Sequence, residues 1–247
     1  MSPTAVPQDT PATPPPDLGR RSDPWTDLAL TLPIFVIYHL GVIFLPVRNA
    51  ADPVTSELRT LAKHSLLTYT ALTLAIGAVF VAVLFTMGRR QALEPKRFLY
   101  VGIEGTLYAV LMRFAGSYVV GSLRLAGGGG GGGEDSVFSS VVMALGAGFY
   151  EEVCFRVGLF GVGAIILRKM LGTGFKGYAA IVCWGIVEAV IFSAWHYNGE
   201  LGDQWDAGSF VFRAVCGLVL TGIFAFRGFA PAVWTHALYD LWVMILG

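Results

Sequence analysis

Long apolar stretches separated by short polar segments constrain this chain more than any other feature of its sequence. Several of them approach or exceed the roughly 20 residues that a helix needs to cross a bilayer. Hydrophobic residues make up 55% of the 247 residues and charged residues only 14%, below the roughly 25% usual in a soluble domain. We therefore expect an all-α, multi-pass transmembrane helical bundle.

The apolar stretches predict about seven spans. The fourth is too long for one straight crossing, so we expect it to be tilted or broken near Gly158, Gly161 and Gly163, and six or eight crossings stay open. The expected spans are 28–46, 66–86, 99–120, 137–167, 178–197, 209–226 and 229–246.

The chain divides into a short tail and one membrane domain. Residues 1–26 are rich in Pro, Thr and Asp, which predicts a disordered N-terminal tail. Residues 27–247 form the expected transmembrane domain. The three cysteines lie inside apolar stretches and are odd in number, which predicts buried thiols without disulfides. The net charge is zero, so no basic field indicates a nucleic-acid partner.

The basic residues predict an orientation, because cytoplasmic loops carry an excess of Lys and Arg. One set of alternating loops holds far more of them than the other, which has only Arg48, Arg59, Lys63 and Arg124. The richer set is Arg20, Arg21, Arg89, Arg90, Lys96, Arg97, Arg168, Lys169, Lys176 and Arg227. We expect an integral protein of the cell (inner) membrane with a cytoplasmic N-terminus. The run 127–133 is then a flexible linker in an outer loop.

A first cluster of charged residues lies inside the fourth apolar stretch. Ionisable groups in a span cost several kcal/mol on most estimates and are functional candidates. Glu152 and Arg156 are four residues apart with the acid first, the favoured order for an ion pair on one helix face. Glu151 points about 100° away and needs a partner on another span, a proton or a water. A structural pair with a second acid at a headgroup is the alternative.

Two further clusters contain histidines. His196 follows Phe192 by four residues at the end of an apolar stretch, where an interfacial role beside Trp195 is the alternative. His236 and Asp240 are one turn apart in the last span, so the carboxylate can orient the imidazole or both can hold an ion. A polar clasp between helices is the alternative for this pair. Together, the three clusters supply groups that activate water and stabilise an oxyanion.

In order, these clusters resemble the three motifs of the CAAX prenyl protease and bacteriocin-processing family of intramembrane proteases. They are Glu151-Glu152-x-x-x-Arg156, Phe192-x-x-x-His196 and His236-x-x-x-Asp240. The resemblance covers about residues 137–247, which we take as the motif-bearing core of a protease domain. It implies an intramembrane endopeptidase that cuts near the C-terminus or membrane-proximal tail of a membrane-associated or exported substrate.

The resemblance also implies residue roles. Glu151 and His196 would activate the attacking water, and His236 and Asp240 would face the oxyanion. Glu152, Arg156 and Phe192 would give structural support. Asp stands where the family motif has Asn or Asp, and an ionised Asp240 cannot donate to an oxyanion, so it would be protonated or act through His236.

The family has been described both as metal-dependent and as glutamate-type. We expect no cofactor, because a carboxylate and an imidazole can activate water without an ion. If the enzyme uses a divalent metal such as zinc, its ligands would be Glu151, His196, His236 and Asp240. The expected partners are a peptide or protein with a membrane-associated tail and the lipid bilayer.

Other functions fit the sequence less well. A His-Glu-x-x-His zinc motif and a Gly-x-Ser-x-Gly elbow are absent. A non-catalytic immunity or partner-binding protein of the same fold is one alternative. An ion-coupled transporter using the charged residues of other spans is another, although no inverted repeat is visible. Those residues are Glu104, Arg113, Glu188 and Arg213.

Overall fold

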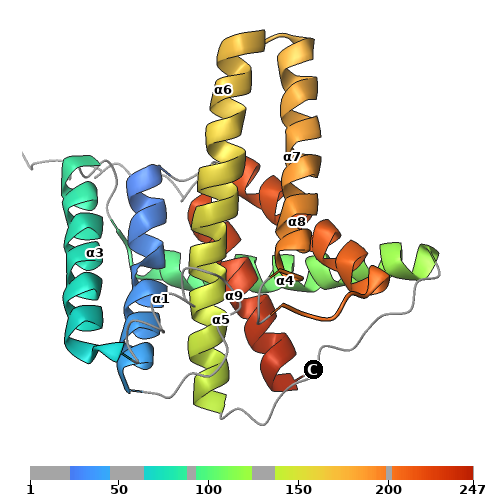
Figure 1. Cartoon of the computed structure of the whole chain (residues 1–247). Coiled ribbons are helices and arrows are strands. Elements are labelled where there is room, and N and C mark those ends of the chain that lie inside the picture. Colours follow the sequence, from blue (N-terminus) through green and yellow to red (C-terminus); the bar gives the residue numbers. More distant parts are fainter. Residues whose placement is uncertain (1–22, 45–63, 88–92, 124–136, 199–201, 247) are drawn as a thin grey trace, which may run out of the picture.

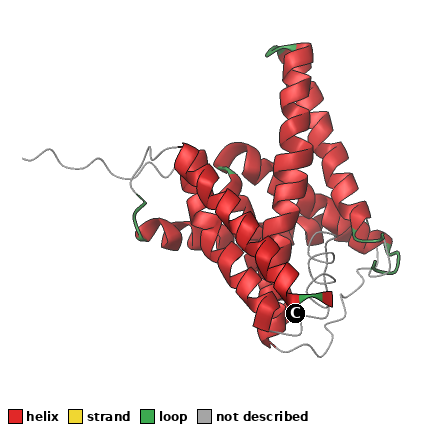
Figure 2. Ribbon diagram, turned by 60° about the vertical axis from the view of Figure 1, so that its left-hand side comes forward, coloured by secondary structure: helices red, strands yellow, loops and turns green. Residues whose placement is uncertain are grey.

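The computed structural model describes residues 23–44, 64–87, 93–123, 137–198 and 202–246, and all regular structure in these ranges is helical (Figures 1 and 2). The predicted all-α fold is confirmed. The elements are α1 (Pro24–Phe44), α3 (Leu66–Met87), α4 (Lys96–Ser122), α5 (Val137–Glu151), η1 (Glu152–Gly161), α6 (Val162–Leu171), α7 (Phe175–Trp195), α8 (Ala207–Arg227) and α9 (Phe229–Leu246). The predicted tail and glycine linker fall almost wholly outside the described residues.

These helices coincide with the seven expected spans. Four of them are long and apolar enough to cross a membrane by length and composition: Pro24–Val42, Lys96–Ser122, Phe175–Trp195 and Ala207–Arg227. Large apolar side chains such as Leu67, Phe114 and Phe226 are mostly exposed. Such a surface suits lipid rather than water, and the chain is an integral membrane protein.

The long fourth stretch is one continuous helix, α5–η1–α6, whose middle part is a π-helix. The break considered near its glycines is absent. Gly163 instead allows close packing, because a Cβ there would collide with the indole of Trp184. The same indole donates from Nε1 to the carbonyl of Leu159 at 3.1 Å. The glycine therefore lets α7 pack against α6, and Figure 1 shows these two helices as a hairpin extending beyond the rest of the bundle.

Helix α9 lies inside the bundle and packs against α1, α4, α5 and α8, while α4 lies across the other helices (Figure 1). The N-terminus of α9 is fixed by α1, since the backbone N–H of Phe229 donates to Asp27 Oδ2 at 2.8 Å. A carboxylate is favourable at a helix N-terminus. At Gly148 of α5, a Cβ would lie 2.6 Å from the backbone nitrogen of Ala237. This close approach of α5 and α9 brings the first and third motifs together.

The expectation of buried cysteines is correct only for Cys216. Cys154 and Cys183 are exposed, and no disulfide joins any of the three cysteines to another described residue. The expectation failed because an apolar residue in a membrane span can face lipid as readily as the protein interior.

Candidate active site

The two adjacent acids stand at the junction between α5 and η1. Glu151 is the last residue of the α-helix and Glu152 the first of the π-helix, and both side chains are buried. A π-helix is wider than an α-helix and occurs frequently at functional sites. The change of helix type gives these neighbours different directions and different partners.

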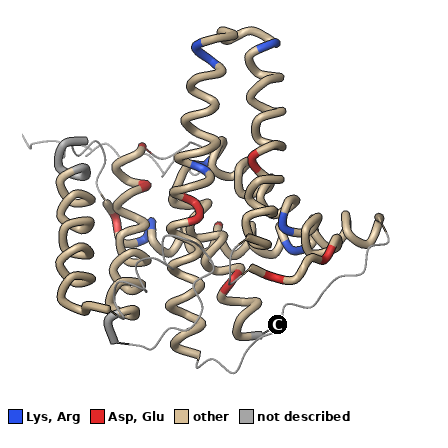
Figure 3. The backbone as a smooth tube through the Cα atoms, in the orientation of Figure 1, with Lys and Arg blue, Asp and Glu red and all other residues tan. Residues whose placement is uncertain are grey.

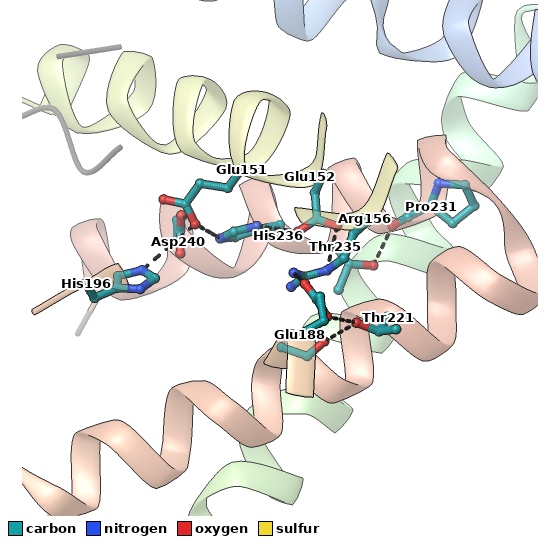
Figure 4. A network of polar contacts seen from close by, with 11 residues as sticks. Glu151, Glu152, Arg156, Glu188, His196, Thr221, Pro231, Thr235, His236 and Asp240 are labelled. Carbon is teal, nitrogen blue, oxygen red and sulfur yellow. Dashed lines mark hydrogen bonds and ion pairs between the residues drawn. The ribbon is translucent and has the colours of Figure 1, made fainter. Parts of the chain in front are cut away.

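Glu152 belongs to a buried chain of charges. Its Oε2 lies 3.3 Å from Arg156 Nε, which confirms the predicted pair. The same guanidinium reaches Glu188 Oε1 of α7 at 2.5 Å, and Thr221 Oγ1 of α8 donates to Glu188 Oε2 at 2.6 Å. Arg156 also lies over the ring of Phe192, 4.5 Å from its centroid. This row of charged and polar side chains links η1 to α7 and α8 (Figure 4).

Glu152 also holds His236. Its Oε1 lies 2.8 Å from His236 Nδ1, and a carboxylate only accepts, so Nδ1 carries a proton. The other ring nitrogen, Nε2, faces Glu151 Oε2 at 3.7 Å and Asp240 Oδ2 at 3.5 Å. Glu152 therefore fixes the orientation of the imidazole, and Asp240 stands on its opposite side.

His196 is oriented by its own helix. Its Nδ1 lies 2.9 Å from the carbonyl of Phe192, to which it donates. Its Nε2 then faces Glu151 Oε2 at 3.9 Å. His196 follows the last residue of α7. With the proton on Nδ1, Nε2 of the neutral imidazole can accept a proton.

The three motifs therefore meet at one oxygen atom. Glu151 Oε2 lies within 4 Å of Nε2 of both His196 and His236, and Figure 4 shows these side chains converging from different helices. Both distances are longer than a direct hydrogen bond. They suit groups that are bridged by one water molecule. The ring of Phe192 packs against both imidazoles, with centroids 5.0 and 5.9 Å away.

A pocket of about 300 Å³ lies beside this oxygen, between the α5–η1 junction and α7. Glu151 is the only carboxylate among its lining residues, and the others are mostly apolar. They are Tyr150, Cys154, Phe155, Leu159, Ile191 and Trp195. If an apolar side chain of a bound peptide occupied this pocket, the backbone of that peptide would lie near Glu151.

Residues 133–242 match the family model described as type II CAAX prenyl endopeptidase Rce1-like. This segment belongs to the CAAX protease family. The match includes all three motifs and helices α5 to α8 with most of α9, whereas α1, α3 and α4 lie outside it. Comparison with curated proteins and with solved structures gave no match.

The CAAX protease segment brings together all seven residues of the three motifs. Glu151, His196, His236 and Asp240 converge, and Glu152, Arg156 and Phe192 surround them. Sequence reasoning missed two contacts: the bond from His236 to Glu152, and the use of Glu188 as the second partner of Arg156. The sequence did indicate that Glu188 is important, because it is a charged residue within a span. It did not indicate that Arg156 is its partner.

The expected ligands of a metal ion, if the CAAX protease segment uses one, are Glu151, His196, His236 and Asp240. Within the ranges that the structure describes, no group of three or more His, Cys, Asp or Glu side chains is arranged to hold an ion. Glu152 bonds Nδ1 of His236 and the Phe192 carbonyl bonds Nδ1 of His196, so both Nε2 atoms face Glu151. Such partners orient an imidazole both for proton transfer and for metal binding.

Proposed function

We propose that this chain is an intramembrane endopeptidase that cuts near the C-terminus or membrane-proximal tail of a membrane-associated or exported substrate. The observation that carries the proposal is the position of Glu151 Oε2, within 4 Å of two imidazole nitrogens and at the edge of an apolar pocket. The match of residues 133–242 to the CAAX protease family supports protease activity in general, without naming a substrate.

In the proposed reaction, Glu151 and the neutral His196 take a proton from a water that lies between them. The resulting hydroxide adds to the carbonyl carbon of the scissile peptide bond. The proton then passes to the leaving nitrogen, and the C–N bond breaks, so the elements of water are added across the bond. Glu151 is the group that collects and returns the proton.

The oxyanion of the tetrahedral intermediate would face His236 and Asp240. His236 can donate from Nε2 only when it also carries a proton there, because its Nδ1 proton is held by Glu152. A protonated Asp240 can donate directly, and an ionised Asp240 acts through His236. The proposed mechanism uses no metal ion, and its oxyanion donors are His236 and Asp240.

The site would open toward the outer face of the membrane. Arg168, Lys169 and Lys176 lie where α6 and α7 meet, and Figure 3 shows Lys and Arg at this end of the hairpin. His196 follows the opposite end of α7, 20 residues or about 30 Å along the helix from Lys176. If the basic turn is cytoplasmic, the site lies toward the outer leaflet, which favours an exported substrate.

A cleavage assay with purified protein in detergent tests the proposal. Membrane-associated peptides with different C-terminal tails are incubated with wild type and with the Glu151→Gln variant, and products are identified by mass spectrometry. We expect at least one peptide to be cut near its tail by the wild type alone. Cleavage by both proteins would indicate a contaminant, and no cleavage of any peptide would favour a non-catalytic protein of this fold.

A further inference from the structure

A second buried polar cluster lies outside the motifs, around His39 of α1. His39 Nε2 lies 2.6 Å from the hydroxyl of Tyr150 on α5, and Nδ1 lies 3.2 Å from the hydroxyl of Tyr69 on α3. Thr73 Oγ1 is 3.4 Å from the same Nδ1. His39 is only 3% exposed. The cluster joins three helices, two of which lie outside the segment that matches the family.

An imidazole is a costly choice for this position. The rings of Phe35 and Tyr38 lie 4.3 and 5.0 Å from the ring of His39, so the faces of the imidazole are packed against aromatic rings. An ionisable residue inside a membrane span is generally functional or paired. Both ring nitrogens of His39 have hydroxyl partners, and the hydrogen bond to Tyr150 is shorter than the one to Tyr69.

Tyr150 connects this cluster to the candidate active site. It precedes Glu151 and lines the same apolar pocket, while its hydroxyl is engaged by a residue of α1. The bond therefore fixes the rotamer of a side chain that forms the pocket wall. Tyr150 also lies in the last turn of α5, two residues before the π-helix begins, so a tether here fixes the rotation of the helix that carries Glu151.

We propose that His39 is a positioning residue for Glu151. Through the Tyr150 hydroxyl, it holds the pocket wall and the α5–η1 junction in the arrangement that aims Glu151 Oε2 at the two imidazoles. This inference rests on the proposed endopeptidase function. It extends the active unit beyond the matched segment, because α1 supplies the tether. Such supporting contacts hold catalytic groups within a fraction of an ångström of their working geometry.

The test compares kcat and KM for five variants at equal amounts of folded protein. Tyr150→Phe and His39→Leu remove the tether and are expected to lower kcat about tenfold. The double variant should be no slower than His39→Leu alone, because both changes remove one interaction. His39→Gln should restore most of the rate, since its amide can still bond the Tyr150 hydroxyl. Tyr69→Phe is the matched control, expected to stay within about twofold of wild type.

A second measurement does not depend on catalysis. Cys154 lines the pocket, whereas Cys183 is exposed on α7 and does not line it. Their labelling rates with a small maleimide therefore compare the pocket with an internal reference. We expect Tyr150→Phe and His39→Leu, but not Tyr69→Phe, to change the Cys154 rate several-fold with Cys183 unchanged.

The two measurements separate the two proposals. A wild type that cuts no peptide but shows the expected labelling pattern would refute the endopeptidase function and leave the tether intact. An active wild type whose tether variants match Tyr69→Phe in both kcat and Cys154 labelling would refute the positioning role. Slower catalysis accompanied only by loss of folded protein, with normal kcat per folded molecule, would refute it as well.

Discussion

The Nδ1 atom of His236 donates to Glu152 Oε1 over 2.8 Å, so the acid that pairs with Arg156 also orients the second histidine. The two neighbouring acids thus act on the same imidazole from its two nitrogens. Glu152 holds Nδ1, and Glu151 faces Nε2 at 3.7 Å. The resemblance implies only structural support from Glu152. The contact with His236 adds a second role, which is to orient this imidazole.

Replacement of either acid by Gln should therefore slow catalysis, with different effects on the fold. Glu151→Gln should lower the cleavage rate by at least about 10²-fold, the scale of a lost general base, at normal folded yield. Glu152→Gln should lower the rate and also destabilise the protein by about 1–3 kcal/mol, because buried partners of the carboxylate lose an acceptor. Rate per folded molecule and melting temperature in detergent measure the two effects. A Glu152→Gln protein with wild-type rate would show that the His236 contact is unimportant.

Asp240 distinguishes an oxyanion role from metal ligation, since Asn has nearly the same shape but donates hydrogen bonds. Asp240→Asn should keep substantial activity with an altered pH profile. Asp240→Leu should lose about 10²–10³-fold, the scale of one oxyanion donor. Cleavage rate against pH is measured for the wild type and both variants. An inactive Asn variant that has also lost a bound ion would contradict the oxyanion role.

Removal of metal should leave the enzyme active. If Glu151 and His196 activate the water, protein treated with a strong chelator and then desalted should cut at the untreated rate. Metal content is determined on the same samples by mass spectrometry. Loss of activity on chelation, with recovery on adding back zinc, would instead make Glu151, His196, His236 and Asp240 the ligand set.

Glu188 should matter for stability more than for chemistry. Glu188→Leu removes one partner of the buried Arg156, which should cost about 3 kcal/mol or more, while the Thr221 hydroxyl keeps the Gly217 carbonyl as acceptor. The rate per folded molecule should stay near wild type, because Glu188 contacts neither imidazole. Glu104→Gln, in the half-buried pair with Arg227, is the matched control and should cost about 1 kcal/mol or less. Equal melting temperatures for the two variants would contradict this difference.

The orientation of the protein in the membrane can be determined by labelling single cysteines, each introduced into a variant that lacks the three native cysteines. Gly174→Cys lies in the basic α6–α7 turn, where a Cβ meets no other atom within 4 Å. Gln204→Cys lies in the exposed segment after His196. An impermeant maleimide added to intact cells should label Gln204→Cys, and it should label Gly174→Cys only after permeabilisation. The reverse pattern would place the site toward the cytoplasm.

The sequence alone determined the features that depend on neighbours along the chain. Apolar stretches of spanning length predicted the helices, because a bilayer sets the length of a crossing. The i,i+4 spacing predicted the Glu152–Arg156 pair, since residues four apart share a helix face. The charged residues inside spans predicted which side chains to examine, because lipid makes them costly.

Only the tertiary structure decided which of these residues meet. His236 bonds Glu152 across 84 positions, Arg156 bonds Glu188 across 32, and His39 bonds Tyr150 across 111. Each contact depends on how far one helix is rotated against another. A helix that is apolar on all sides carries no amphipathic signal for that rotation. The rotation is set instead by close packing at small residues, as at Gly148 against Ala237, and by the buried polar bonds themselves.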